Sequence, residues 1–169
     1  MLIDIHRISG KGLLLDDRVE LDPNYLIEDG SFFLEGIDYN VVFKRDGSRV
    51  KSKGRLHTSV SLQCVDCLEN FDLKIDSKFD IILFPVDEIE INSISLNPDD
   101  MEYIFYEGDK IDLSKILMEQ VNLFIPFNPV CSPGCRGICP NCGVNLNYGK
   151  CKCEHPLNEM NFFFSKLKR

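Results

Sequence analysis

The placement of the cysteines constrains this 169-residue chain more than any other feature. Two of the eight, Cys64 and Cys67, form a Cys-x-x-Cys pair in mid-chain, and the other six fall within residues 131–153. The N-terminal stretch is charged where a secretory signal would be apolar, so we expect a cytoplasmic protein whose thiols stay reduced. Such spacing in a reducing compartment favours metal binding or thiol chemistry over structural disulfides.

The later cysteines predict a first metal site. In the segment from Cys139 to Gly143, two thiolates separated by two residues can occupy two corners of a tetrahedron, and the glycine permits a tight turn. Cys151 and Cys153 form a second close pair, separated from Cys142 by the eight residues 143–150. The predicted Zn²⁺ ligands are Cys139, Cys142, Cys151 and Cys153. In the alternative, Cys135 replaces one of the last two. Metal binding would stabilise a segment too short and polar to form a core.

Four cysteines remain, and they predict a second site. Its ligands would be Cys64, Cys67, Cys131 and Cys135. If the segment from Pro126 to Pro129 brings Cys131 and Cys135 back beside the turn that holds the mid-chain pair, this site would join the tail to the body. An alternative reading is a thiol-disulfide oxidoreductase that uses Cys64 and Cys67. Thioredoxin-like dithiols precede a helix, whereas this pair is expected to join two strands, which counts against redox catalysis.

The body of the chain has the composition of a β protein. Alanine is absent and the apolar residues are bulky, which favours pleated strands. Apolar and polar residues alternate in residues 37–43, 56–64 and 71–83, with Asp46-Gly47 as a turn between the first two stretches. We predict an antiparallel meander or a partly closed barrel, followed by a loop over 87–100 and a strand over 101–106.

One helix is predicted over residues 112–125. Asp112 can cap it and Pro126 ends it. The residues expected on its buried face are Leu113, Ile116, Leu117, Val121 and Phe124. A short terminal helix is expected from Asn158 to Lys168. The predicted fold class is therefore α+β, with a body over 1–130 and a zinc-ribbon-like, cysteine-rich tail over 131–169. The longest apolar run, 81–86, is too short to cross a membrane.

The net charge of −8 hides a division between an acidic body of −12 and a tail of +4. Positive charge is concentrated around the Asp46-Gly47 turn and in the tail. The candidate nucleic-acid-binding residues are Lys44, Arg45, Arg49, Lys51, Lys53, Arg55 and Arg136. Locally concentrated cations can bind phosphates on an acidic protein. The alternative is an ordinary solvated hairpin. The three histidines are scattered and no nucleophile motif is present, so we do not expect an enzyme.

Three features of the sequence resemble the bacterial YceD-like family, the large ribosomal RNA subunit accumulation proteins. They are the Cys64–Cys67 pair before a long strand, the helix before Ile125-Pro126, and the tail from Cys135 to Cys153 with its Asn145-Leu146-Asn147 segment. The resemblance covers roughly residues 50–155. It implies a non-catalytic cytoplasmic role in the maturation or accumulation of large-subunit ribosomal RNA, with precursor rRNA or a ribosome assembly factor as the partner.

One departure from that family lies after the last cysteine. Relatives carry an Asp-Pro-Arg segment there, whereas this chain has Glu154-His155-Pro156-Leu157 and lacks the arginine. Any contact that this arginine makes in relatives is therefore not expected here. A third function remains open, a zinc-ribbon module that binds proteins and makes no RNA contact.

Overall fold

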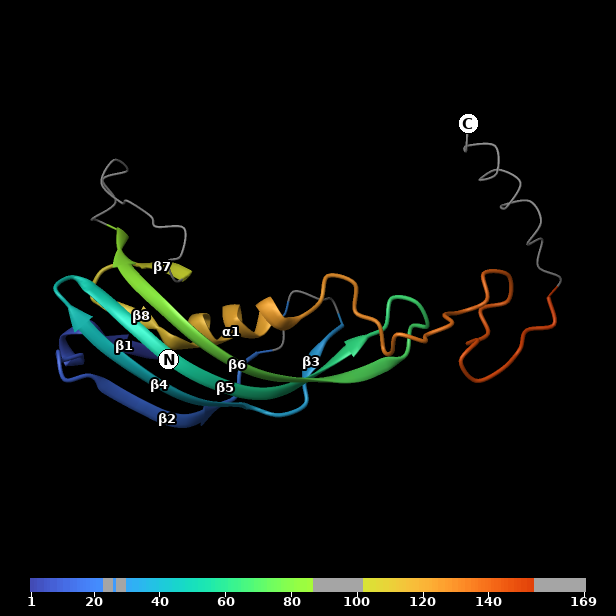
Figure 1. Cartoon of the computed structure of the whole chain (residues 1–169), viewed down its shortest axis with the longest axis horizontal. Coiled ribbons are helices and arrows are strands. Elements are labelled where there is room, and N and C mark those ends of the chain that lie inside the picture. Colours follow the sequence, from blue (N-terminus) through green and yellow to red (C-terminus); the bar gives the residue numbers. More distant parts are fainter. Residues whose placement is uncertain (23–25, 27–29, 87–101, 154–169) are drawn as a thin grey trace, which may run out of the picture.

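The computed structural model describes residues 1–22, 26, 30–86 and 102–153. The predicted terminal helix and the predicted loop over 87–100 lie outside the described residues. The described part is elongated, with the sheet and helix at one end and the cysteine-rich tail at the other (Figure 1).

The main sheet contains the predicted meander and additional strands. Its order along the sheet is β2 (Leu13–Val19), β4 (Ile37–Asp46), β5 (Arg49–Gln63), β6 (Asn70–Pro85) and β7 (Glu102–Tyr106), and β3 (Phe32–Phe33) pairs with β5. Strands β4, β5 and β6 are antiparallel in sequence order, so the meander is confirmed. The turn between β4 and β5 passes through Gly47, whose positive φ of 65° is accessible to a residue without Cβ.

Two features of the sheet differ from the predicted antiparallel meander or barrel. Strand β7 pairs with β6 in the parallel direction, so the sheet is mixed. The strand order also has two different ends, β2 and β7, so within the described residues the sheet is open and the partly closed barrel was wrong. Parallel neighbours need a long crossover connection, which alternation within single strands cannot reveal.

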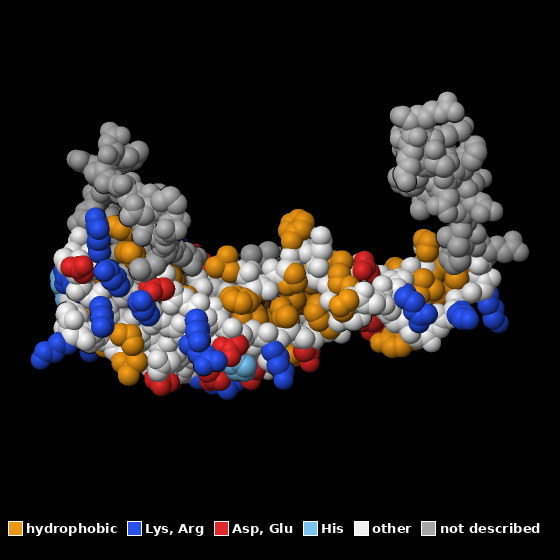
Figure 2. Space-filling model, viewed as in Figure 1, with side chains coloured by type: hydrophobic (Ala, Val, Ile, Leu, Met, Phe, Trp, Pro, Cys, Tyr) orange, Lys and Arg blue, Asp and Glu red, His pale blue; other side chains and the backbone are white. Residues whose placement is uncertain are grey.

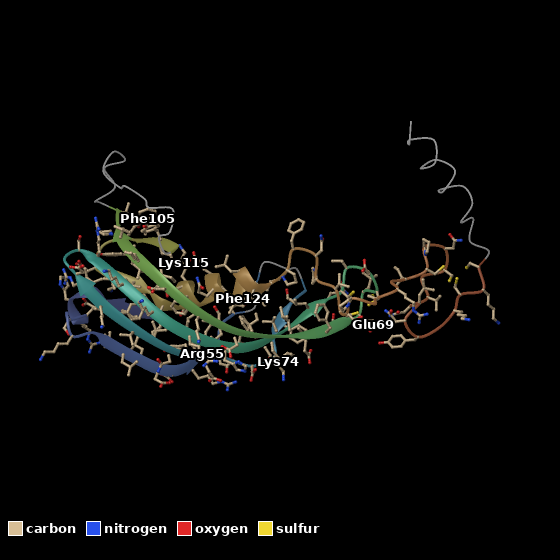
Figure 3. All side chains as sticks on the ribbon, viewed as in Figure 1. Arg55, Glu69, Lys74, Phe105, Lys115 and Phe124 are labelled. Atoms are coloured by element: carbon tan, nitrogen blue, oxygen red, sulfur yellow. The ribbon has the colours of Figure 1, made fainter. Side chains whose placement is uncertain are left out.

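Helix α1 (Leu113–Phe124) covers the concave side of the sheet (Figure 1). The carboxylate of Asp112 accepts a hydrogen bond from the Ser114 backbone N–H at 3.1 Å, which confirms the predicted cap. The helix follows directly on β8 (Lys110–Asp112), which pairs with β1 (Leu2–Asp4) ahead of a short 3₁₀ turn, η1 (Ile5–Arg7). Phe124 was predicted to be buried but is 47% exposed, because it lies at the end of α1 (Figure 3).

The core lies between α1 and the concave face of β4, β5 and β6. Alternate residues of these strands point into it, including the fully buried Val41, Phe43 and Leu56. Gly54 is required at the centre of β5, because a Cβ there would lie 2.5 Å from the ring of Phe79. The β5–β6 hairpin continues past the end of α1 and carries its turn, residues 64–69, toward the tail (Figure 1). Among the described residues, no helix is long and apolar enough to span a membrane.

Candidate metal centres

The eight cysteines lie in two groups of four. The body cluster contains Cys64, Cys67, Cys131 and Cys135, and the tail cluster contains Cys139, Cys142, Cys151 and Cys153. Within each group the four Sγ atoms all lie within 4.8 Å of one another. These are the two sets of four that the spacing predicted. Cys135 belongs to the body cluster, so the alternative in which it replaces a tail ligand is not observed.

The hairpin turn between β5 and β6 supplies half of the body cluster. The Leu68 backbone N–H donates to the Cys64 carbonyl at 2.9 Å, and the Cys64 N–H donates to the Glu69 carbonyl at 2.9 Å. Leu68 has a φ of 62°, the one non-glycine residue with positive φ in the described chain. This turn directs both thiols of the Cys-x-x-Cys pair to the same side. No local signal predicts that a leucine would occupy the left-handed position.

The segment after α1 supplies the other half of the body cluster. The Val65 N–H donates to the Pro129 carbonyl at 2.9 Å, so the proline-rich segment is held against the hairpin turn. The Sγ atoms of Cys64 and Cys135 are then 3.8 Å apart, and those of Cys67 and Cys131 are 3.7 Å apart. Four thiolates around a tetrahedral ion with bonds of about 2.3 Å would be about 3.8 Å apart. These distances fit a metal ion and exclude disulfides, whose sulfur atoms are about 2.05 Å apart.

The tail cluster repeats the same turn. The Gly143 N–H donates to the Cys139 carbonyl at 2.8 Å, as Leu68 does to Cys64, and Gly143 has a φ of 71°. The Cys139 N–H donates to the Val144 carbonyl at 2.8 Å. One isolated bridge, between Ile138 and Asn145, is the only strand-like pairing in residues 131–153. The zinc-ribbon-like part of the predicted fold is therefore not confirmed.

The two clusters are connected by Asn147, which sequence analysis did not identify as a site residue. Its Nδ2 atom donates to Sγ of Cys135 in the body cluster at 3.4 Å, although Asn147 lies in the loop of the tail cluster. Its Oδ1 atom accepts from the Arg136 backbone N–H at 2.8 Å. The signal in the sequence was the Asn145-Leu146-Asn147 segment, in which Oδ1 of Asn145 accepts from the Asn147 N–H at 2.9 Å.

The tail also contacts the hairpin turn directly. The Ile138 N–H donates to the Asp66 carbonyl at 3.1 Å, and a Cβ at Gly137 would lie 3.1 Å from that same oxygen. Close approach and a φ of 67° both favour glycine at position 137. Asn145 donates through Nδ2 to the Glu69 carboxylate at 3.4 Å, where the hairpin meets the tail (Figure 3).

Each cluster contains one thiol that ionises readily. Burial opposes ionisation of Cys64, but backbone hydrogen bonds from Cys131, Cys67 and Asp66 outweigh it and lower its pKa to about 6. At Cys139 a backbone hydrogen bond from Cys142 stabilises the thiolate by more than burial destabilises it. The pKa of Cys139 is therefore also lowered to about 6. A thiolate in each cluster can therefore begin to bind a cation at neutral pH.

The other shifted thiols resist ionisation. At Cys67 a backbone hydrogen bond from Glu69 favours the thiolate, but burial and the neighbouring thiols outweigh it and raise the pKa to about 12. Hydrogen bonding to Cys142, with burial, raises the pKa of Cys153 to about 12. The pKa values of Cys131 and Cys151 are raised as well. Four adjacent thiols cannot all ionise without a cation, and a metal ion supplies the required positive charge.

Several of the cations predicted to bind RNA are paired with carboxylates of the protein. Arg55 donates to Asp76 at 2.9 and 2.7 Å, and this bidentate pair lowers the pKa of the Asp76 carboxyl. Lys53 pairs with Asp80, and Lys51 lies 4.0 Å from Asp46. Arg55 and Lys74 lie on the side of the sheet opposite α1 (Figure 3).

The remaining predicted RNA-binding residues are placed as follows. The Arg49 guanidinium lies 4.8 Å from the centre of the Phe84 ring, and Arg45 donates to the Gly47 carbonyl at 2.8 Å. Lys44 is exposed opposite Lys51 on the neighbouring strand. Arg136 lies in the tail and donates to the Asn147 carbonyl at 2.8 Å. The predicted hairpin site is therefore a surface of mixed charge, and RNA binding by these residues stays a prediction.

Comparison with known proteins identifies the group that this chain resembles. The family model "Large ribosomal RNA subunit accumulation protein YceD" matches residues 52–169. A chloroplastic YCED homolog 1 of Zea mays is 30% identical over 137 residues, which are 67% of this chain and 46% of the relative. The Arabidopsis thaliana homolog is 28% identical over 131 residues, 64% of this chain and 41% of the relative. The chain thus spans less than half the length of these plant relatives.

A shorter match links the chain to an uncharacterized protein of Mycobacterium tuberculosis. The two are 50% identical over 38 residues, which are 22% of this chain and 18% of the relative. No solved structure matches the chain.

Proposed function

Because the chain belongs to the YceD family of large ribosomal RNA subunit accumulation proteins, we propose that it is an accessory factor in the maturation or accumulation of large-subunit rRNA. In this proposal its two cysteine clusters bind zinc, and the protein contacts RNA or an assembly partner without catalysing a reaction. The plant relatives are described as chloroplastic. A cytoplasmic location for this chain stays a prediction.

The observation that carries the zinc proposal is the pair of four-thiol clusters. Four thiolates at tetrahedral spacing are typical ligands of structural zinc, and soft sulfur ligands disfavour magnesium and calcium. A site with four protein ligands has no open position for water or substrate. Zinc here would hold the tail against the hairpin and would order the tail itself, so its proposed contribution is to folding.

The oxidoreductase alternative is less well supported than a structural role. Cys64 is fully buried and Cys67 is 4% exposed, so neither presents a thiolate to a protein substrate. Each of these thiols also contacts a cysteine of the tail side, Cys135 or Cys131. A dithiol of a redox enzyme needs an accessible nucleophile. The lowered pKa of Cys64 is therefore better explained as preparation for a metal ion.

Elemental analysis tests the zinc proposal. The full chain, purified without added metal, is expected to contain close to two zinc ions per molecule, with Cys64 and Cys67 unreactive toward thiol reagents. Metal-free protein with a rapidly reacting Cys64–Cys67 pair would contradict the proposal and support the oxidoreductase.

A binding titration tests the RNA proposal separately. We expect the zinc-loaded chain to bind precursor large-subunit rRNA, and the affinity to fall as salt is raised because bound phosphates release counterions. A matched precursor of the small subunit serves as the control. The absence of binding to either RNA would leave a protein partner as the contact and would remove RNA from the proposal.

A further inference from the structure

Two aromatic side chains of the described chain are almost fully exposed. Phe127 is 91% exposed and Tyr148 is 81% exposed, the two highest values among the large apolar residues that the structure describes. Phe127 lies in the segment that joins α1 to the body cluster, and Tyr148 lies in the loop of the tail cluster. Their surroundings differ, and the difference indicates different partners.

The loop that carries Tyr148 is held by its own hydrogen bonds. The Tyr148 N–H donates to the Asn145 carbonyl at 3.4 Å, and the Leu146 N–H donates to the Gly137 carbonyl at 2.8 Å. Cys142 and Cys151, ligands of the tail cluster, flank the loop on either side. The ring is therefore presented on a fixed backbone, and binding to it would require little further ordering of the chain.

The segment that carries Tyr148 is basic, although Asn145 of the same loop contacts the Glu69 carboxylate of the β5–β6 turn. Residues 131–153 contain no Asp or Glu, and their three basic residues, Arg136, Lys150 and Lys152, are all exposed. The Arg136 guanidinium donates to the carbonyl of Asn147, the residue before Tyr148, at 2.8 Å. This bond fixes a positive charge beside the backbone of the loop. Lys and Arg side chains are visible on the tail in Figure 2.

The neighbours of Phe127 are apolar. Leu123, Phe124 and Val130, which are close to it in the sequence, are exposed by 65%, 47% and 37%. Hydrophobic side chains gather on the surface between the body and the tail (Figure 2). A contiguous apolar surface suits contact with another protein, whereas an isolated aromatic ring among cations suits nucleic acid.

We propose that Tyr148 stacks on an unpaired base of RNA and that Arg136, Lys150 and Lys152 bind the adjacent phosphates. This inference rests on the proposed RNA-binding function and names the form of RNA that the tail recognises. An unpaired base is required because the faces of bases in a duplex are already stacked on their neighbours. Aromatic side chains stack on single-stranded bases of any sequence, since every base has a π face.

The negative charge of a zinc-loaded tail cluster would increase the share of the RNA affinity that stacking supplies. A zinc ion with four thiolates carries a formal charge of about −2, which offsets the lysines that flank Cys151. Net attraction between the tail and RNA phosphates is thereby reduced. The ring of Tyr148 must then supply a larger part of the affinity, and this part is insensitive to salt.

The experiment compares three variants of the zinc-loaded full chain in binding to fluorescent oligouridylate and to an RNA duplex of equal length. Tyr148→Ala is expected to weaken binding to oligouridylate by about 5- to 150-fold, because stacking contributes about 1–3 kcal/mol per base. Tyr148→Phe keeps the ring and is expected to bind as the wild type does. Phe127→Ala, at the other exposed aromatic residue, is the matched control and is expected to bind normally. Zinc content is measured for every variant.

Crosslinking of the wild-type protein provides a test that needs no variant. Ultraviolet irradiation with 4-thiouridine RNA is expected to attach the RNA at Tyr148, as located by mass spectrometry. Three results would overturn the stacking proposal and leave RNA binding intact. They are wild-type affinity in Tyr148→Ala, an equal loss of affinity for the single strand and the duplex, and crosslinks confined to the β4–β5 hairpin. If the wild-type chain binds neither RNA, both the stacking proposal and the RNA part of the proposed function are wrong.

Discussion

The body cluster and the tail cluster each consist of four cysteines but are assembled differently. The body cluster joins residues 71 positions apart, through a hairpin turn that the β sheet forms on its own. The tail cluster takes all its cysteines from residues 139–153, a segment whose single bridge pairs Asn145 with Ile138 and which contributes nothing to the hydrophobic core. We therefore expect the hairpin half of the body cluster to fold without metal, and the tail cluster to need metal for its structure.

Their exposure differs as well. Cys64 and Cys67 in the β5–β6 turn are both buried, whereas in the equivalent pair of the tail cluster Cys139 is buried and Cys142 is exposed. One kind of site can thus have two effects. A metal ion bound in the body cluster would attach a neighbouring segment to a stable sheet, whereas an ion bound in the tail cluster would itself hold the segment together.

Removal of zinc is expected to have the largest effect and to separate the two regions. A chelator should abolish protection of residues 131–153 from hydrogen exchange, because structural zinc contributes about 10–16 kcal/mol in such modules. Protection in β5 and β6 should persist, since their pairing and core do not use the ion. Loss of protection throughout the chain would show that the body also depends on metal.

Acidification is expected to weaken both clusters similarly. At pH 7 Cys67 and Cys131 are protonated because their pKa values are raised, and so are Cys151 and Cys153. Each zinc ion must therefore displace at least two protons, so its affinity falls by at least about a hundredfold as the pH falls from 7 to 6. Calorimetric titrations in buffers of different ionisation enthalpy measure the proton release. Release of fewer than two protons per ion would contradict the raised pKa values.

Substitution of Asn147 is expected to weaken the body cluster from within the tail. Asn147→Leu keeps a side chain of similar size but removes two hydrogen bonds, the one to Sγ of Cys135 and the one accepted from the Arg136 backbone N–H. Loss of such a supporting bond costs about 10- to 100-fold in metal affinity. Competition for zinc with a chelating dye measures the change at each cluster. Val144→Ala, an exposed position in the same loop, is the control and should leave both affinities unchanged.

Exchange of the left-handed residues is expected to have the smallest effect. Leu68 and Gly143 have nearly the same φ and make the same backbone hydrogen bond. Leu68→Gly should relieve strain of about 1 kcal/mol, offset in part by greater freedom of the unfolded chain. Gly143→Leu should destabilise the tail by about 1–2 kcal/mol. Urea titration measures the free energy of unfolding of the body, and hydrogen exchange measures the stability of the tail. If Gly143→Leu were tolerated as well as Leu68→Gly, leucine would be unstrained in the tail turn, and the two turns would not be equivalent.

Much of the fold followed from local pattern. Alternation predicted the three meander strands, and Asp112 and Pro126 predicted the limits of α1, because these signals act over a few residues. The parallel pairing of β6 with β7, the open sheet and the exposure of Phe124 were not predicted, because each depends on which distant segments meet. The division of the chain into a body over 1–130 and a tail over 131–169 stays a prediction.

The sequence by itself determined the chemistry of the sites. Cysteine spacing predicted two sets of four thiols, and the tail residues from Cys135 to Cys153 already carried the family resemblance. Only the tertiary structure decided how the sets are built and connected. The proline-rich segment returns to the hairpin through the bond from Val65 to Pro129, and Asn147 links one cluster to the other. Ligand identity is a property of side chains, whereas their convergence depends on contacts between segments that local sequence does not specify.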